Sequence, residues 1–316
     1  MKRIHCIGVM VVDLLSGPIK DYPVPRVHPQ VTTQWIRVMP GGGAANAPAA
    51  LARMGLPVGT FSKIGQDFNG EFILRELRNL GIDTAGVCVS PGEVTPFTFV
   101  GIHADGDRTF IHTPGVNLAF TPADLDLDRV FAADYLLYHD LWVLPAMDGK
   151  PAASLLAEAQ RRGLVTFLDE GFGYGPKADA LELMLPYCDF VIPSCDDLRV
   201  IYPGASAEEI ADKLLARGAR HAVLKMGREG CLVAWGAHRT CVPALPAKVL
   251  DTTGAGDCWD AGFIAALAHG EEIVTAARIG NACAAFCIEA IGGSTGVPDY
   301  ASVRQRAAAQ GAAQHG

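Results

Sequence analysis

Residues 251–257 form a glycine-rich segment, Asp251-Thr252-Thr253-Gly254-Ala255-Gly256-Asp257, directly before an apolar helix predicted near Asp257–Ala268. Gly254 and Gly256 permit positive φ and a close approach of another group to the backbone. The start of a helix leaves amides unpaired and carries partial positive charge, so this segment predicts a nest for a phosphate. Asp257 at its mouth could accept a proton from a hydroxyl that attacks phosphorus. A simple helix cap is the alternative.

A second glycine-rich segment, Pro40-Gly41-Gly42-Gly43-Ala44-Ala45-Asn46, opens a helix predicted over Ala44–Met54. Its consecutive glycines expose backbone amides, and Asn46 can both donate and accept hydrogen bonds. A tight turn followed by an interior asparagine would have the same sequence. Asp13 follows a predicted first strand, Ile4–Val12, at the edge where ligands of α/β sheets bind. A turn or cap role for Asp13 is the alternative.

Three other motifs were weighed against these segments. A GxxxxGK[ST] phosphate loop is absent, and Gly41-Gly42-Gly43 with Asn46 fails the GxGxxG dinucleotide pattern. Gly292-Gly293-Ser294-Thr295-Gly296 matches the GxSxG hydrolase elbow, which needs a strand before it and a helix after it. A predicted helix precedes it and Val297-Pro298 follows, so the sequence disfavours a hydrolase that uses Ser294.

The elements that must position these segments alternate between strand and helix. This alternation predicts parallel βαβ units and a sheet covered on both faces. Strands are predicted at Val58–Ile64, Tyr135–Tyr138, Val165–Asp169, Phe190–Ile192 and Ala222–Met226. Helices are predicted at Phe68–Leu80, Ala152–Arg162, Ala178–Leu185, Ala207–Ala216 and Ile273–Ala290.

Two strand-like segments, about 14–38 and 95–113, interrupt the alternation. The second contains a predicted hairpin, Thr98–His112, with Asp105-Gly106-Asp107 as its turn. Paired together, the two segments would form a small sheet that covers the ligand edge as a lid; ordinary surface loops are the alternative. We expect one α/β domain over residues 1–300, into which these two segments are inserted, and a tail, 301–316, that is a frayed helix or disordered.

The composition excludes several classes of protein. The chain has 316 residues, of which 50% are hydrophobic and 19% are charged, which excludes wholesale disorder. Its net charge of −8 makes nucleic acid an unlikely partner, and no apolar run approaches the length of a membrane span. Met1-Lys2-Arg3-Ile4 leads into a strand-like run without a long apolar signal segment. Nine scattered cysteines predict reduced thiols and a cytoplasmic protein.

Together, the two glycine-rich segments resemble the two signatures of the ribokinase-like, or pfkB-type, carbohydrate kinase family. The first runs from Gly41 to Ala49, with Gly55 and Gly65 beyond it, and the second continues to Phe263. The resemblance covers about residues 4–300. It implies a three-layer αβα sandwich with a mainly parallel central sheet and a small β-sheet lid. It also implies transfer of the γ-phosphoryl group of ATP, with Mg²⁺, to a hydroxyl of a sugar or nucleoside.

The resemblance assigns roles to individual residues. It implies that Asp257 is the catalytic base and that the amides of Gly254, Ala255 and Gly256 form an anion hole. It implies acceptor contacts from Asp13, Gly42, Gly43 and Asn46, and nucleotide contacts from Lys225, Gly227 and Asn281. A solvated strand-end lysine and an exposed helix asparagine are the alternatives for Lys225 and Asn281. The positions that match a potassium site of some members are Asp251, Thr253, Cys287, Ala290, Gly292 and Gly296.

One departure from the family pattern concerns magnesium. The family carries an Asn-x-x-Glu motif after a central strand, whereas this chain has Ser194 and Asp197 at those positions. Asp197 can still organise magnesium-bound water, because Mg²⁺ prefers oxygen ligands and keeps several waters. The departure is consistent with either a shifted metal geometry or a weaker kinase.

The sequence does not identify the acceptor molecule. His139 and Asp140 end a predicted strand at the ligand edge, and Asp169-Glu170-Gly171-Phe172-Gly173 ends the next one. The acidic pair could touch a metal-bound phosphate or cap the following turn. Lid residues Asp105, Arg108 and His112 could reach an acceptor or form a solvated face. A nucleobase could stack on Phe97, Phe99 or Phe110, or these rings could serve only in packing.

We therefore expect an ATP-dependent kinase that acts on a small sugar. The alternatives are a nucleoside kinase of the same family, a sugar- or nucleotide-binding protein that has lost turnover, and the disfavoured hydrolase. Because the lid sheets of this family often pair between subunits, the resemblance also implies a homodimer.

Overall fold

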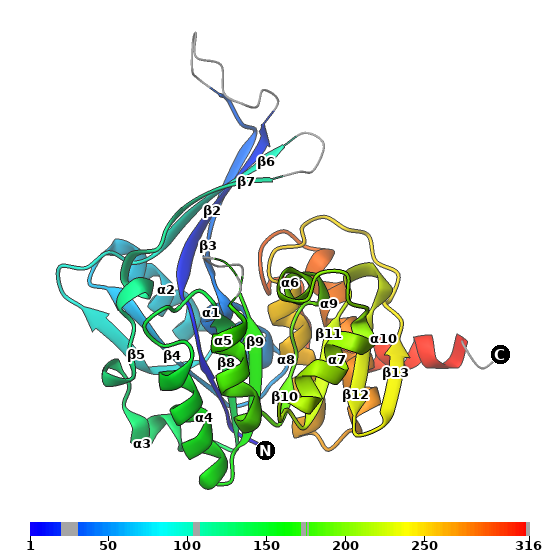
Figure 1. The fold of residues 1–316 in the computed structure, drawn as a ribbon. Helices are drawn as coiled ribbons and strands as arrows, with labels where there is room; N and C mark the ends of the chain where they lie inside the picture. The colour runs from blue at the N-terminus through cyan, green and yellow to red at the C-terminus, as the bar shows by residue number, and fades with distance from the viewer. Residues whose placement is uncertain (20–30, 104–107, 172–174, 176, 314–316) are drawn as a thin grey trace.

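The computed structural model describes residues 1–19, 31–103, 108–171, 175 and 177–313. Within these residues, nine strands form a large sheet, which runs through the centre of the molecule (Figure 1). Its spatial order is β13 (His238–Val242), β12 (Cys231–Trp235), β11 (His221–Lys225), β10 (Phe190–Val191), β9 (Val165–Glu170), β8 (Tyr135–Leu141), β1 (Ile4–Ile7), β4 (Val58–Gly65) and β5 (Asp83–Ser90). Neighbours from β11 to β5 are parallel, and β12 and β13 form an antiparallel edge.

Helices cover both faces of this sheet, which confirms the predicted αβα sandwich. One face carries α1 (Gly43–Arg53), α2 (Phe68–Asn79), α8 (Ala255–Ala268), α9 (Ile273–Ile288) and α10 (Tyr300–Ala313). The other carries α3 (Leu127–Val130), α4 (Lys150–Arg161), α5 (Ala178–Met184), α6 (Cys195–Ile201) and α7 (Ala207–Ala216). The strand period of two divides the cores: Tyr135 and Leu137 of β8 pack into the first and Leu136 and Tyr138 into the second.

A second sheet projects from the body (Figure 1) and confirms the predicted lid. Its order is β3 (Trp35–Gly41), β2 (Val11–Ile19), β6 (Phe97–His103) and β7 (Arg108–Thr113). The predicted hairpin turn at Asp105–Asp107 lies outside the described residues. The predicted first strand, Ile4–Val12, was wrong: the chain leaves the large sheet after Ile7 and enters the lid at Val11. Nothing in the sequence marks this break, because Val9, Met10 and Val11 are buried too and the apolar run continues through them.

The path between the two sheets explains the position of Asp13. The chain turns at Gly8, where a Cβ would lie 2.6 Å from Oδ2 of Asp140. Asp13 therefore lies within β2, paired with Met39 and Thr98, and does not end a strand of the large sheet. This is a correction to the sequence prediction, and it makes Asp13 part of the lid.

Helix α1 brings the first glycine-rich segment against α8. Its alanines are small enough to let the two helices approach, and Ala44, Ala47 and Ala50 are fully buried. Pro48 within the helix has no amide for the Ala44 carbonyl, but the Thr60 hydroxyl donates to that oxygen at 2.6 Å. The tail forms α10, where Val303 and Ala307 are buried. Within the described part of the chain, no helix has the length and apolarity needed to span a membrane.

Candidate active site

The predicted phosphate nest lies where α8 begins. Gly254 precedes the helix with φ of 71°, in the left-handed region. A Cβ there would lie 2.9 Å from Cα of Gly293, so only glycine fits without a backbone shift. The amides of the first helical turn have no carbonyl within the helix to bind, although that of Ala255 lies 3.3 Å from the Thr252 carbonyl oxygen. Ala255 and Gly256 both border the large cavity described below.

Asp257 lies in the first turn of α8, and its carboxylate is held at both oxygens. Asn46 donates from Nδ2 to Oδ2 at 2.7 Å, and Nε2 of His139 lies 3.2 Å from Oδ1. Burial opposes ionisation, but His139 and Asn46 outweigh it and lower the pKa of Asp257. The side chain keeps 18% of its surface exposed. It is thus an ionised, oriented carboxylate that a reactant can reach, as a general base requires.

The glycines of the first segment make room for polar side chains at the end of β8. A Cβ on Gly43 would collide with the His139 ring, and one on Gly42, at φ of 84°, would collide with the Val9 carbonyl. The Gly43 amide donates to Oδ2 of Asp140 at 3.1 Å, and the Val9 amide donates to the same oxygen at 2.7 Å. Asp140, at the end of β8, therefore holds both the link between β1 and β2 and the start of α1. An acceptor contact through the Gly43 amide or Asp140 stays a prediction.

Asp13 approaches the base from the lid. Its carboxylate lies against Gly41, where a Cβ would collide with it. Burial raises the pKa of Asp13 to about 7, and the charges of Asp257 and Asp251 add to this effect, which Thr98 opposes. An acidic side chain that is partly protonated near neutral pH can both donate to and accept from a hydroxyl.

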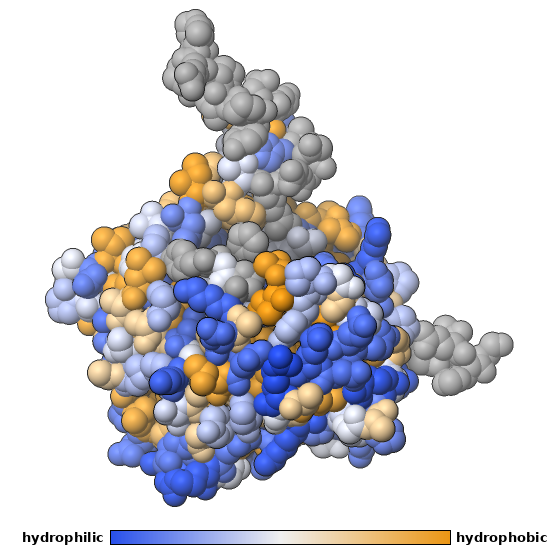
Figure 2. All heavy atoms as spheres, viewed as in Figure 1, coloured by the Kyte–Doolittle hydropathy of each residue, from blue (hydrophilic) through white to orange (hydrophobic). Residues whose placement is uncertain are grey.

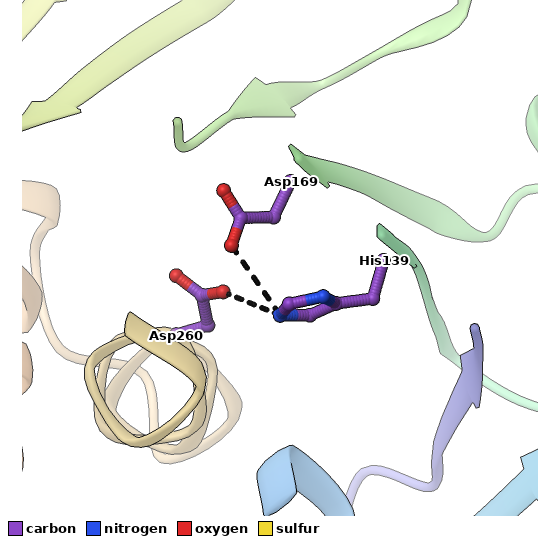
Figure 3. A group of neighbouring side chains, drawn as sticks. All are labelled: His139, Asp169 and Asp260. Atoms are coloured by element: carbon purple, nitrogen blue, oxygen red, sulfur yellow. Dashed lines mark hydrogen bonds and ion pairs between the residues drawn. The ribbon is translucent and has the colours of Figure 1, made fainter. Parts of the chain in front are cut away.

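Behind Asp257, a buried cluster contains His139, Asp169 and Asp260 (Figure 3). Both carboxyl groups approach the same nitrogen of the His139 ring, with Nε2 3.3 Å from Oδ2 of Asp169 and 3.1 Å from Oδ2 of Asp260. Lys225 of β11 contacts the same pair, with Nζ 2.7 Å from Oδ2 of Asp169 and 3.1 Å from Oδ1 of Asp260. Four elements of the fold, β8, β9, β11 and α8, therefore meet through these charged side chains.

A cavity of about 670 Å³ opens beside the start of α8, and its size is that of a small-molecule site. Its walls are mainly apolar and include Gly227, Ala244, Trp259, Ala285 and Ile288, with Lys225 and Gly256 at the end nearest Asp257. The ammonium group of Lys225 is close to Gly256, since a Cβ there would lie 3.4 Å from Nζ. An apolar wall with a cation and helix amides at one end suits a nucleotide base and its phosphates.

Two of the predicted nucleotide residues behave differently in this cavity. Gly227, at φ of 54°, has open space where a Cβ would be, so the chain turns there without crowding the cavity. Asn281 is buried, and its side chain accepts from Nε1 of Trp259 at 2.8 Å and donates to the Val242 and Pro243 carbonyls. It therefore braces the cavity wall, and a direct contact with an adenine stays a prediction.

Acidic residues at the end of β9 and after β10 are the candidates for holding a divalent metal. The Ser194 amide donates to Oε1 of Glu170 at 2.8 Å, while Oε2 of Glu170 is buried with no hydrogen-bond partner among the described residues. Burial, with the neighbouring Asp169, raises the pKa of Glu170 well above its usual range. A bound Mg²⁺ would favour the ionised form of this carboxyl group and give Oε2 a positive partner, so the residue fits the metal. Asp197, in α6, is half-buried and does not line the 670 Å³ cavity.

The residues that match a potassium site form a hydrogen-bonded ring. Asp251 accepts from the amide and hydroxyl of Thr253 at 3.0 and 2.7 Å and from the Gly292 amide at 2.8 Å. The Gly292 carbonyl accepts twice from Thr295, and the Cys287 carbonyl accepts from Ala290. The Cys287 thiol donates towards the carbonyls of Thr253 and Gly293. Gly296 offers no side chain. The donors of all these hydrogen bonds belong to the protein itself, and the reaction proposed for this site does not depend on potassium.

The remaining residues that the sequence suggested make no hydrogen bond to the groups around Asp257 in the described part of the chain. Ser294 is buried after α9, with no strand before it, so the hydrolase elbow is not formed. His112 bonds Thr98 across the lid, and the Phe110 ring is exposed on it. The predicted contacts of Asp105, Phe172 and Gly173, and of the Arg108 side chain, lie outside the described residues.

Sequence reasoning missed the part played by Asp260. Its spacing from Asp257 was a usable signal, because residues three apart share a helix face. The convergence of His139, Asp169 and Lys225 on that face had no local signal, since each ends a different strand.

Comparison with known proteins identifies what this arrangement is similar to. The family model for "pfkB family carbohydrate kinase" matches residues 1–300. A 5-dehydro-2-deoxygluconokinase of Geobacillus kaustophilus is 27% identical, covering 95% of this chain and 91% of the relative. A nucleoside kinase of Methanothermobacter thermautotrophicus is 25% identical, covering 92% and 91%. The solved structure of an Arabidopsis thaliana ribokinase complexed with ribose and ATP matches with a TM-score of 0.84 and 23% identity, covering 97% and 98%.

Proposed function

The chain belongs to the pfkB family of carbohydrate kinases, and from that premise we propose that it transfers the γ-phosphoryl group of ATP to a hydroxyl of a small sugar with Asp257 as the base. The observation that carries this proposal is the orientation of the Asp257 carboxylate. Asn46 and His139 hold its two oxygens. The preceding residue, Gly256, borders the 670 Å³ cavity that suits the nucleotide.

In the proposed reaction the acceptor lies between Asp257 and the lid. Its hydroxyl oxygen bonds to the γ-phosphorus, and the bond from that phosphorus to the bridging oxygen of ADP breaks. The hydroxyl proton passes to Asp257, and ADP leaves with the electron pair of the broken bond. Amides at the start of α8 lie where charge develops on the transferring group. Asn46 and Asp13 provide the donors and acceptors that bind neighbouring hydroxyls of a sugar.

Magnesium would be held through Glu170, with Asp197 as the matching family position. When bound, the ion neutralises charge on the β- and γ-phosphates. The backbone amide of Ser194 already holds Oε1 of Glu170, and Oε2 of the same side chain has no partner among the described residues. Glu170 is therefore held in position although residue 194 is a serine and not an asparagine. Lys225 adds a fixed positive charge at the phosphate end of the cavity.

We further propose that the protein is a cytoplasmic homodimer joined through the lid sheets. All nine cysteines are free thiols, as a reducing compartment favours. On one face of the lid, Val38 pairs with Leu14, Leu14 with Phe99, and Phe99 with Ile111, so their side chains share that face. Ile36, Val38 and Ile111 are 61%, 48% and 64% exposed. Figure 2 shows apolar surface at the foot of the lid. A second lid is the self-complementary partner that such a face fits.

An ADP-release screen over sugars, sugar acids, sugar phosphates and nucleosides tests the function. We expect ATP-dependent release with at least one neutral sugar and none with Asp257→Asn. Release with nucleosides alone would favour the nucleoside kinase. Ligand-induced thermal shifts without release over the whole panel would favour a binding protein and overturn the proposal.

A further inference from the structure

The backbone is strained where β8 ends. Asp140 has a φ of 63° and Trp142 a φ of 77°, and in the described part of the chain they are the only residues other than glycine with positive φ. Trp142 is held in this conformation, because its amide donates to Oδ2 of Asp148 at 2.9 Å and its indole N–H to the Lys177 carbonyl at 3.1 Å. Strain of this kind costs free energy and concentrates at functional sites, so we examined what it positions.

In this conformation the Asp140 carboxylate faces two segments that carry candidate acceptor residues. Its Oδ2 atom accepts from the Val9 amide at 2.7 Å and from the Gly43 amide at 3.1 Å. Asp13 of the lid follows Val9 closely in the chain, and Asn46 lies one helical turn after Gly43 in α1. One oxygen atom therefore holds the segments that place both of these side chains.

Glycines from three separate segments make room for this carboxylate. A Cβ on Gly8 would lie 2.6 Å from Oδ2 of Asp140, and a Cβ on Gly43 would lie 2.7 Å from the same atom. A Cβ on Gly171, directly after β9, would lie 3.0 Å from Cα of Asp140. A larger residue at any of these positions would displace the carboxylate or the chain around it. The side chain of Asp140 is only 10% exposed.

The backbone of Asp140 is also linked to the base, through His139. The Asp140 amide donates to Nδ1 of His139 at 2.9 Å, so the ring proton lies on Nε2. Nε2 faces Oδ1 of Asp257 at 3.2 Å and Oδ2 of Asp260 at 3.1 Å (Figure 3 draws the second contact), and a neutral ring can donate to either. Asp140 therefore bears on the base as well as on the two segments that it holds through its carboxylate.

We propose that Asp140 is a positioning residue of the kinase reaction, which sets the placement of Asp13 and Asn46 relative to Asp257 and acts on the acceptor through them. The proposal rests on the function proposed above, in which these three side chains surround the reacting hydroxyl.

A direct contact between Asp140 and the acceptor is the competing explanation. Its Oδ2 atom already accepts two hydrogen bonds from backbone amides. Its Oδ1 atom lies 3.4 Å from Nδ1 of His139, and a Cβ on Gly171 would lie 3.1 Å from it. These neighbours enclose the carboxylate, which favours the positioning role.

Two substitutions of Asp140 test the proposal. Asparagine adopts the left-handed backbone readily and keeps an oxygen that can accept from both amides, whereas alanine does neither. We expect Asp140→Ala to lose about 10- to 100-fold in kcat/KM for the acceptor, as displaced reacting groups do, and Asp140→Asn to stay within about threefold of wild type. The Kd of ATP should stay within about threefold in both, because Asp140 does not line the 670 Å³ cavity.

Asp148→Ala is the matched control. It removes the carboxylate that holds the other strained residue, Trp142, and that accepts from the Tyr138 hydroxyl, but it touches neither the lid segment nor α1. We expect it to lower stability to urea and to keep kcat/KM for the acceptor within about threefold of wild type. A loss equal to that of Asp140→Ala would trace the effect to the strained turn as a whole and overturn the proposal.

A double-mutant cycle separates positioning from direct contact. If Asp140 acts through Asn46, Asp140→Ala should cost several-fold less kcat/KM in an Asn46→Ala background than in the wild-type background, because the group it places is already gone. A direct contact with the acceptor would make the two losses multiply. Losses that multiply, or an Asp140→Asn enzyme as impaired as Asp140→Ala, would overturn the proposal.

A second measurement needs no turnover. In the ¹⁵N-labelled full chain, hydrogen exchange and proton chemical shifts of the Val9 and Gly43 amides report whether each is bonded to the carboxylate. We expect slow exchange in the wild type and in Asp140→Asn, and faster exchange at both amides in Asp140→Ala. Unchanged signals in Asp140→Ala would overturn the proposal. If no acceptor supports ADP release by the wild-type protein, the proposed function fails, and these signals still decide whether Asp140 holds the two segments.

Discussion

Asn46 and Asp257 lie 211 positions apart in the chain, and a 2.7 Å hydrogen bond from Nδ2 to Oδ2 joins their side chains. The bond brings the two glycine-rich segments into one site, because α1 carries Asn46 and α8 carries Asp257. It also fixes which carboxylate oxygen faces away from α1. The predictions below follow from this geometry and from the groups around it.

Asp257→Asn should abolish phosphoryl transfer and leave nucleotide binding intact. The amide keeps the shape of the side chain but cannot take a proton, and loss of a general base costs about 10²- to 10⁴-fold in kcat. Nucleotide affinity should change by less than about threefold, because the residue is not among those that line the 670 Å³ cavity. Calorimetry with ATP and an ADP-release assay measure the two quantities. Turnover near the wild-type rate would remove Asp257 as the base.

Gly254→Ala, just before α8, should damage the site more than the same change at Gly270, just beyond the other end of that helix. Both Gly254 and Gly270 have positive φ, of 71° and 84°, so an alanine costs about 1–2 kcal/mol at either position. At Gly254 the added Cβ would also lie 2.9 Å from Cα of Gly293 and 3.2 Å from Nδ2 of Asn46, whereas at Gly270 nothing lies within 4 Å. We expect Gly254→Ala to lose at least tenfold in kcat and Gly270→Ala to keep it.

Urea unfolding of the two glycine variants provides the comparison of stability. Gly254→Ala should lose more unfolding free energy than Gly270→Ala, because its new Cβ meets backbone that must shift. Equal stability and equal kcat in the two variants would mean that the start of α8 tolerates a side chain, against the proposed phosphate nest.

The sequence predicted the αβα layers and the lid because each depends on local patterns of hydrophobicity and turn residues. It failed at Asp13, because an apolar run that continues through Met10 gives no sign that the chain changes sheets. It also missed β5, an edge strand whose exposure does not alternate regularly and whose first four residues include Asp, Ala and Gly, which are uncommon in strands.

Within the site, the two glycine-rich segments were recognisable but the supporting groups were not. Gly43 was expected to contact the acceptor, and that stays a prediction, but no feature of the sequence indicated that its amide donates to Asp140. The cluster behind Asp257 comes from residues at the ends of β8, β9 and β11, which only the order of the sheet brings together. Such long-range charge pairing has no periodic signature in a single sequence.

Asp13 should make stability depend on pH in an unusual direction for an aspartate. Burial raises its pKa to about 7 in the folded protein, above the value of about 4 in an unfolded chain. The native state therefore binds more protons between these values, and this contribution to stability is full below about pH 4 and lost as pH rises through 7. Asp13→Asn should accordingly stabilise the protein relative to wild type at pH 8, on the order of 2–4 kcal/mol, and much less at pH 5.

Urea unfolding at pH 5 and pH 8 measures this difference. Any effect of the substitution on packing is the same at both pH values, so it drops out when the two are compared. Thr98→Val is a useful companion, because Thr98 opposes the rise in the pKa of Asp13. A stability gap between wild type and Asp13→Asn that is equal at both pH values would contradict the raised pKa.

Lys225 and Asp169 should show strong coupling in stability. Their ion pair is 2.7 Å long, with 12% and 2% of the side chains exposed. Burial opposes both charges, but each partner outweighs it, lowering the pKa of Asp169 and raising that of Lys225. Lys225→Met leaves a buried carboxylate uncompensated and should cost about 3–5 kcal/mol. The double variant with Asp169→Asn should recover part of that loss. Additive losses in the double-mutant cycle would mean that the pair does not interact in solution.

The lid face should decide the oligomeric state. A glutamate in place of Val38 or Ile111 would place a charge in the proposed contact between two lids, where desolvation without a partner costs several kcal/mol. We expect wild-type sedimentation at twice the chain mass of 33.4 kDa and sedimentation of Val38→Glu/Ile111→Glu at the single-chain mass. Val200→Glu is the matched control, because Val200 is 63% exposed on α6 of the body. A wild-type monomer, or a double variant that stays dimeric, would contradict pairing through this face.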